Sequence, residues 1–189
     1  MSHPFDFISE LDAYDDTASS VHRLNQRYDH IVAPFKADIE GARVLDLGSH
    51  DGRWPYALAY AGAREVVGIE ARPALIASFK DFPDDAHRAK VTLRQGDVFE
   101  VMEEMKRYKE RFDVVAIYGL LYHTTEHYRL LLLAQAMQPK LIIVDSEFIV
   151  ASDGPIIRFM REDVENELNT VARRQGHQVE LVGTPSMRL

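Results

Sequence analysis

The 189-residue sequence contains no cysteine, so it can form no disulfide, no thiolate zinc site and no cysteine nucleophile. It also has no run of about 18 apolar residues, the length that a membrane-spanning helix needs. The first residues, MSHPFDFISE, lack the basic and apolar regions of a secretion signal. These absences predict a cytoplasmic protein that does not span a membrane.

Positive charge is scarce as well. Twenty-two Lys and Arg residues stand against 30 Asp and Glu residues, which gives a net charge of −8. A large nucleic-acid footprint needs a basic face, so the composition disfavours a nucleic-acid partner but leaves a local basic patch open. Apolar residues are present in the ordinary amount, 46%, and the length suits one domain with a sizeable core.

Short apolar runs alternate with helical patterns through the middle of the chain. Strands are expected at residues 43–47, 65–69, 91–94, 113–118 and 140–144. Helices are expected between them at about 53–61, 73–79, 99–110 and 125–136. This alternation predicts an α/β fold with a Rossmann-like, doubly wound and mostly parallel sheet that is covered on both faces.

The two ends of the chain have patterns of their own. Residues 1–40 predict an N-terminal helical cover, in which apolar residues recur near a helical period from Val21 to Phe35 and Pro34 ends or kinks the helix. Residues 41–189 carry the sheet, and the whole chain is expected to be a single domain. No clear antiparallel hairpin follows Leu181, so the C-terminal hairpin is expected to be incomplete. A second copy or a partner subunit could cover the exposed sheet edge.

Glycines and acids follow the predicted strands, where the carboxyl ends of parallel strands present a ligand site. They are Asp46, Gly48 and Gly52 after the first strand, Glu70 after the second, and Gly96 and Asp97 after the third. Glycine permits positive φ and a close approach of the backbone to a ligand. Glu70 can accept hydrogen bonds from both hydroxyls of a ribose, and Asp97 can accept one from the amine of an adenine.

Asp46 indicates which kind of nucleotide is bound. Dinucleotide sites have the spacing G-x-G-x-x-G and leave a helix N-terminus free for the pyrophosphate. Here the spacing is D-x-G-x-x-x-G, and Asp46 and Asp51 would repel a pyrophosphate. An acid at this position suits a nucleoside ligand that carries an ammonium group.

The segment from about residue 43 to residue 150 resembles class I S-adenosylmethionine (SAM)-dependent methyltransferases. The matching motifs are VLDLGSHDG, VVGIE and GDV. The resemblance implies a methyltransferase with SAM as its cofactor, bound by the part of the chain at 41–189. It implies that the following residues bind the cofactor: Asp46, Gly48, Ser49, His50, Gly52, Glu70, Ala71, Gly96, Asp97, Val98 and Tyr118. We interpret His50 as a turn residue whose backbone touches the cofactor.

The stretch YGLLYH at 118–123 is similar to the GVLYH segment of carboxy-SAM-dependent tRNA wobble-uridine carboxymethyltransferases and their methyltransferase relatives. The similarity implies that Tyr122 faces the transferred group. His123 follows it and can be a general base, since its free pKa is near neutrality, or a capping or packing residue. Tyr122 and His123 are therefore the candidate catalytic residues. Trp54, Tyr118 and Tyr122 can form aromatic walls for the sulfonium.

Two residues of the helical cover are further candidates for cofactor binding. Arg27 or Tyr28 could meet the methionine carboxylate, because an N-terminal helix often closes over the cofactor in this fold class. The alternative is a solvated arginine beside a core tyrosine. No metal is expected: His123 and His127 could bind one with Asp145 and Glu147, but two exposed helix histidines are the simpler interpretation.

The absence of two motifs narrows the range of possible methyl acceptors. No [D/N]-P-P-[Y/F] motif follows the fourth strand, as amine-methylating enzymes of nucleic acids require, and no cysteine can attack a pyrimidine. The preferred hypothesis is methyl transfer to the O or N atom of a small molecule. The second is alkyl transfer onto tRNA, and the third is a non-catalytic SAM-binding partner subunit.

Overall fold

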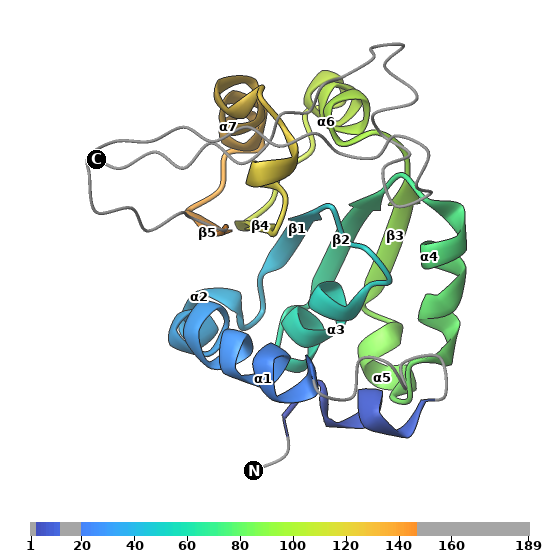
Figure 1. The fold of residues 1–189 in the computed structure, drawn as a ribbon. Coiled ribbons are helices and arrows are strands. Elements are labelled where there is room, and N and C mark those ends of the chain that lie inside the picture. Colours follow the sequence, from blue (N-terminus) through green and yellow to red (C-terminus); the bar gives the residue numbers. More distant parts are fainter. Residues whose placement is uncertain (1–2, 12–19, 147–189) are drawn as a thin grey trace, which may run out of the picture.

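The computed structural model of the chain describes residues 3–11 and 20–146 (Figure 1). Five strands form one sheet in the order β3-β2-β1-β4-β5, and every pair of neighbours is parallel. The strands are β1 (Arg43–Leu47), β2 (Glu65–Glu70), β3 (Val91–Gln95), β4 (Val114–Tyr118) and β5 (Leu141–Asp145). The predicted Rossmann-like parallel sheet is confirmed, whereas the expected C-terminal hairpin lies outside the described residues.

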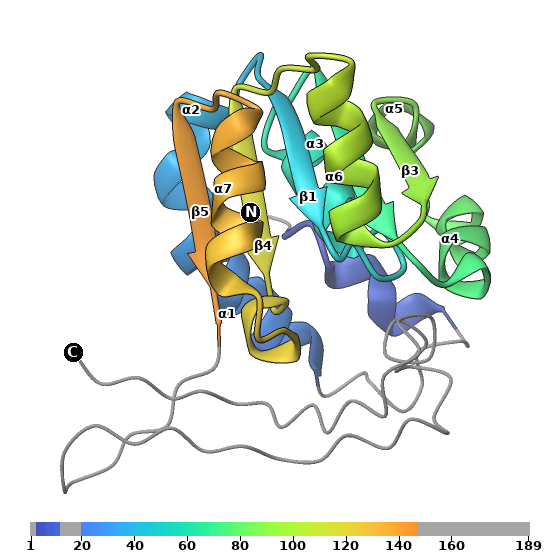
Figure 2. The ribbon, with the colours of Figure 1, turned by 90° about the horizontal axis from the view of Figure 1, so that it is seen from above.

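Helices cover both faces of the sheet, as Figures 1 and 2 show. On one face lie α1 (Ser20–Ile31), η3 (Ala33–Phe35), α2 (Lys36–Ile39) and α3 (Arg53–Tyr60). The opposite face carries α6 (Val98–Arg107) and α7 (His127–Ala136). Shorter elements are η1 (Asp6–Glu10), α4 (Pro73–Ser78), η4 (Phe79–Asp81), α5 (Asp85–Arg88) and η5 (Leu121–His123).

Burial on both faces explains why the central strands are nearly continuous apolar runs. Side chains alternate between two cores, so Val44 of β1 packs toward α3 while Leu45 packs toward α6 and α7. Asp46 has the same parity as Val44 and therefore points to the α3 side. Successive strands are added in one direction from β1 to β3 and in the opposite direction from β4 to β5. The switch point, where ligands bind in such sheets, therefore lies between β1 and β4.

The first described residues belong to the core beneath α3. Phe5 and Ile8 are fully buried, and the ring of Phe5 lies 5.1 Å from that of Trp54 in an edge-to-face arrangement. The Tyr118 hydroxyl donates to the carbonyl of Ile31 at 3.2 Å and so ties β4 to α1. The sequence predicted α1 but not η1, because five residues are too few to display a period. The division at residue 40 stays a prediction.

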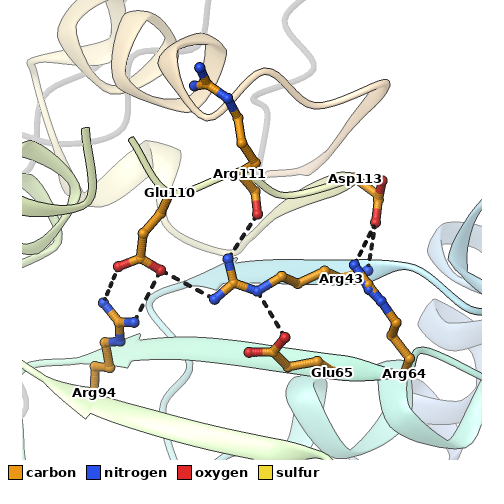
Figure 3. Close-up of polar contacts among 7 residues, drawn as sticks. All are labelled: Arg43, Arg64, Glu65, Arg94, Glu110, Arg111 and Asp113. Carbon is orange, nitrogen blue, oxygen red and sulfur yellow. Dashed lines mark hydrogen bonds and ion pairs between the residues drawn. The ribbon is translucent and has the colours of Figure 1, made fainter. Parts of the chain in front are cut away.

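An ion-pair network closes the edge of the sheet where the strands begin (Figure 3). Arg43 donates to Glu65 at 2.8 Å, to Glu110 at 3.2 Å and to the carbonyl of Arg111 at 2.9 Å. Its guanidinium also lies over the ring of Phe112, 4.2 Å from the centroid. The network joins β1 and β2 to the loop before β4, at the end of the sheet opposite to the predicted ligand site.

Within residues 3–11 and 20–146, no helix has both the length and the apolar character needed to cross a membrane.

Candidate cofactor site

Asp46 lies at the switch point with an unpaired carboxylate oxygen. Its side chain is 1% exposed, and Oδ2 has no hydrogen-bond partner among the described residues. Burial, reinforced by the negative charge of Glu70 and opposed by the Ser49 hydroxyl, raises the pKa of Asp46 to about 7. A buried acid without a partner is costly in a native fold, so this oxygen marks a place for a cationic or hydrogen-bond-donating ligand.

The loop after β1 has the backbone conformation that its glycines suggest. Gly48 and Gly52 have φ values of 77° and 87°, and His50 between them has a φ of 55°. The N–H groups of Gly48 and Ser49 both donate to the carbonyl of Ile69, which fixes the loop against the end of β2. His50 thus occupies a left-handed turn position, where glycine is favoured but not required.

Gly68, which sequence analysis missed, makes room for this loop. A Cβ on Gly68 would lie 2.3 Å from the hydroxyl of Ser49, a side chain that is fully buried. A glycine in the interior of a predicted strand indicates that another part of the backbone approaches closely, so Gly68 in VVGIE could have been singled out. Ser49 and Gly68 together let the β1 loop sit directly on β2.

Glu70 at the end of β2 is 4% exposed and fully hydrogen-bonded. Its Oε2 accepts from the N–H of His50 at 2.9 Å and from Arg72 Nη2 at 3.2 Å. Its Oε1 accepts from the N–H of Arg72 at 3.0 Å and from Arg72 Nε at 2.7 Å. Ala71, between Glu70 and Arg72 in the sequence, is buried. The predicted ribose acid therefore lies at the expected edge of the sheet, but its pairing with Arg72 was not predicted from the sequence.

The negative charge of Asp51, in the loop after β1, is neutralised by Arg53. Arg53 donates to its Oδ1 from Nε at 2.8 Å and to its Oδ2 from Nη2 at 2.7 Å. Burial opposes ionisation of Asp51, but the nearby imidazole of His50, the hydrogen bonds from Arg53 and the arginine charge outweigh it, so the pKa of Asp51 is well below its usual range. The repulsion of a pyrophosphate at this end of the sheet therefore rests on Asp46 more than on Asp51.

Asp97 follows β3 and caps α6. Its Oδ1 accepts from the N–H groups of Phe99 at 2.9 Å and Glu100 at 3.2 Å, while Oδ2 accepts no hydrogen bond from the described residues. Gly96 donates its N–H to the carbonyl of Glu70 at 3.0 Å, and Val98 begins α6. Asp97 thus lies next to the end of β2 with one oxygen available for a donor such as an adenine amine.

Tyr122 and His123 lie in η5, directly after β4. Gly119 has a φ of 72°, and a Cβ there would lie 3.3 Å from the hydroxyl of Tyr122, so this hydroxyl lies over the end of β4. The rings of Tyr122 and His123 are 4.3 Å apart, and His123 is exposed to solvent. Both predicted catalytic side chains are therefore at the ligand end of the sheet.

Tyr118 and Trp54 are core residues beside the site. Both are buried, with ring centroids 5.1 Å apart. Burial and the carboxylates of Asp46 and Asp145 raise the pKa of Tyr118 far above its ordinary value. Tyr118 therefore stays protonated and donates to α1, which suits an aromatic wall and excludes it as a base.

Arg27 and Tyr28 of α1 lie in different surroundings. Arg27 forms an ion pair with Asp145 at the end of β5 and lies 4.8 Å from the ring centroid of Trp54. Tyr28 is buried against Tyr60 of α3, with ring centroids 6.1 Å apart. Arg27 is thus at the ligand end of the sheet, whereas the contacts of Tyr28 are those of a core tyrosine. Binding of the methionine carboxylate by either residue stays a prediction.

His123 and His127 are not placed to bind one metal ion together. His123 belongs to η5 and His127 begins α7, so they do not share a helix face. His127 is half-buried and its Nε2 is 2.8 Å from the carbonyl of Leu121, which corrects the interpretation of two exposed helix histidines. In the described parts of the chain, no three His, Asp or Glu residues are grouped for a metal. Glu147 lies outside these parts.

Comparison with known proteins assigns the class. Residues 44–139, about half of the chain, match the family model described as a methyltransferase domain. The tRNA U34 carboxymethyltransferase of Marinobacter nauticus is 34% identical over 121 residues, which are 64% of this chain and 33% of that protein. The enzyme of the same name from Campylobacter hominis is 27% identical over 104 residues, 54% of this chain and 34% of that protein. The chain spans about a third of the length of these two relatives.

Among solved structures, the N-terminal domain of EvdMO1 with S-adenosylhomocysteine (SAH) bound is similar. The TM-score is 0.53 at 26% identity, over 75% of this chain and 60% of that domain. Fold and comparisons together define a class I SAM-dependent methyltransferase domain. The chain belongs to the methyltransferase domain family, and the predicted cofactor, SAM, is confirmed.

Proposed function

We propose that this protein transfers a methyl group from SAM to an oxygen or nitrogen atom of a small molecule. The observation that carries the proposal is the buried Asp46 carboxylate, whose Oδ2 lacks a partner beside Glu70 at the switch point. A cationic amino-acid nucleoside matches this arrangement, because an ammonium group supplies the missing donor and positive charge. A pyrophosphate supplies neither.

The strand ends provide one group for each part of the cofactor. Asp46, with the backbone of Gly48 and Gly52, receives the methionine moiety, and Glu70 accepts from the ribose hydroxyls. Asp97 Oδ2 accepts from the adenine amine, with Gly96 and Val98 beside the ring. Ser49, His50 and Ala71 contribute backbone contacts, and Tyr118 provides an aromatic wall. The roles of Asp46 and Asp97 follow from the carboxylate oxygens that the described residues leave open, and the role of Glu70 follows from its buried position at the end of β2.

SAM supplies an activated sulfonium methyl group, so the protein mainly has to align an acceptor with it. Tyr122, whose hydroxyl lies over the end of β4, orients the acceptor. The imidazole of His123, whose ring lies 4.3 Å from that of Tyr122, takes the proton that an O–H or N–H acceptor loses. Its position next to Tyr122, at the ligand end of the sheet, supports this role.

Calorimetry with SAM, SAH and NAD tests the cofactor site. We expect SAM and SAH to bind and NAD not to bind, and Glu70→Ala to weaken SAH binding by about 1.5–3 kcal/mol, the range for a hydrogen bond to a charged group. Binding of NAD without SAM would refute the assignment, and an unchanged affinity of Glu70→Ala would refute the ribose role.

A radiolabelled-methyl assay over a panel of hydroxyl and amine compounds tests the acceptor class. Once an acceptor is found, the pH–rate profile of His123→Ala decides between a base and a packing residue. If the acidic limb of the pH–rate profile is lost in this variant, the result supports His123 as the general base. A rate and profile like those of the wild type would assign His123 to packing.

Transfer of a methyl or carboxymethyl group onto tRNA is the second candidate. The YGLLYH segment and the two relatives named tRNA U34 carboxymethyltransferase favour it. The net charge of −8 opposes it, because phosphate contacts need Lys and Arg. Binding of tRNA that weakens steeply with salt would support this candidate, and the absence of binding at low salt would eliminate it.

A further inference from the structure

Every acceptor position of Glu70 is taken by a donor from this chain. An ionised carboxylate has about four lone-pair sites. The N–H of His50 and Arg72 Nη2 donate to Oε2, and the N–H and Nε of Arg72 donate to Oε1. A ribose whose two hydroxyls donate to Glu70 must therefore replace two of these four donors.

The four donors differ in how easily they can leave. Two are backbone amides in the loops after β1 and β2, and these loops are fixed by further hydrogen bonds, such as that from Ser49 N–H to the Ile69 carbonyl. The other two belong to the guanidinium of Arg72, which can rotate away on its side chain without moving the backbone. The guanidinium is the exchangeable partner of Glu70.

We propose that Arg72 sets the ribose specificity of the cofactor site, because its guanidinium exchanges with the ribose hydroxyls at Glu70 and replaces any hydroxyl that a ligand lacks. The inference rests on the proposed function of Glu70 as the ribose acid. The guanidinium presents two parallel N–H donors to the two carboxylate oxygens. The 2′- and 3′-hydroxyls of a ribose also present two donors, so the two groups compete for the same atoms.

Exchange makes the wild-type site tolerant of a missing hydroxyl. With a 2′-deoxy ligand, Arg72 keeps one N–H on the carboxylate oxygen that the absent hydroxyl would have bonded. If Arg72 is replaced by methionine, the stem remains but no donor does, and the same ligand leaves a buried charged oxygen short of a partner. Such an unmet acceptor is costly, so the 2′-hydroxyl becomes more important in the variant.

Asp51 and Arg53 provide a matched control in the same chain. Arg53 bonds Asp51 with the same three atoms, N at 3.1 Å and Nε at 2.8 Å to Oδ1 and Nη2 at 2.7 Å to Oδ2. The spacing of two residues between acid and arginine is also the same. Asp51 has no proposed contact with the ribose, so Arg53→Met removes an equivalent fork without affecting ribose recognition.

The test is calorimetry of SAH and its 2′-deoxy analogue with the wild type, Arg72→Met and Arg53→Met. We expect a preference for SAH of about threefold in the wild type and Arg53→Met, and of about tenfold or more in Arg72→Met. A wild-type preference in Arg72→Met would overturn the inference. Should that variant fail to fold, Arg72→Lys is the substitute, because lysine keeps the charge but not the two parallel donors. An increased preference for SAH over its 2′-deoxy analogue in Arg72→Lys supports the inference, and an unchanged preference overturns it.

Glu70→Gln separates this inference from the proposed function. If the wild type does not bind SAH, or if Glu70→Gln binds it as tightly as the wild type, the ribose site itself is wrong. If Glu70→Gln binds SAH more weakly while Arg72→Met keeps the wild-type preference, the ribose site stands and only the role of Arg72 is refuted.

Discussion

At the scale of single residues, Asp46 couples stability to pH. Its pKa of about 7 in the folded chain lies above the value of about 3.9 for an unfolded aspartate. Between these two values the folded state keeps a proton that the unfolded state has lost. Rising pH therefore removes stability, by up to about 1.4 kcal/mol per pH unit for this one group.

We predict that Asp46→Asn flattens this dependence. Urea unfolding at about pH 5 and about pH 8 should show a smaller loss of unfolding free energy in the variant than in the wild type. The same variant should bind SAM about tenfold more weakly or worse, because the ammonium group loses a charged acceptor. Equal pH slopes in the two proteins would contradict the raised pKa of Asp46.

Gly52 should not tolerate a side chain. Its φ is 87°, and a Cβ would lie 2.4 Å from Cδ2 of Phe79. We predict that Gly52→Ala lowers the free energy of unfolding by about 1–3 kcal/mol and weakens SAM binding. Gly41→Ala is the control, since Gly41 has a φ of 71° but no atom within 4 Å of an added Cβ. Equal losses in the two variants would mean that backbone strain alone, and not the contact with Phe79, is responsible.

The residue types at the strand ends could be predicted from the sequence, but their partners could not. Asp46, Glu70 and Asp97 follow apolar runs, so their positions could be expected at one edge of a parallel sheet. The pairing of Glu70 with Arg72, and the contact of Phe79 with Gly52, depend on rotamers and loop packing that have no periodic signal. Charged residues on loops most often indicate only a solvated surface.

At the scale of elements, the hydroxyl of Tyr118 connects β4 to α1. We predict that Tyr118→Phe lowers the free energy of unfolding by about 1 kcal/mol and increases hydrogen exchange in α1, since the carbonyl of Ile31 loses its donor. The control is Tyr108→Phe, because the Tyr108 side chain is 68% exposed. Exchange in α1 that is unchanged by Tyr118→Phe would show that this contact does not hold the helix.

Strong periodicity made the long elements predictable. The strands at 43–47 and 91–94 and the helix at 53–61 agree with β1, β3 and α3 to within one residue at each end. Elements of three to five residues, such as η1 and α5, were missed because one turn has no measurable period. Their place in the structure is set by burial of side chains such as Phe5, which is a tertiary effect.

At the scale of the whole molecule, the Arg43 network should stabilise the fold without affecting the site. We predict that Arg43→Met lowers the free energy of unfolding by about 1–3 kcal/mol, because Glu65 and Glu110 lose a partly buried partner. SAH affinity should stay the same, since the network is at the opposite edge of the sheet. The control Arg64→Met removes an exposed ion pair with Asp113 and should cost less than about 1 kcal/mol. A changed SAH affinity in Arg43→Met would show that the two edges are coupled.

The central position of β1 also has a consequence for the order in which the chain folds. During synthesis β2, which pairs with one side of β1, is complete at residue 70, whereas β4, which pairs with the other side, follows only at residues 114–118. Until then one side of β1 lacks its partner, and closing that pair needs a loop of about 70 residues. We therefore expect the β1–β4 pair to form in a slow, non-local step of folding, and the cofactor site at the switch point to form only after it.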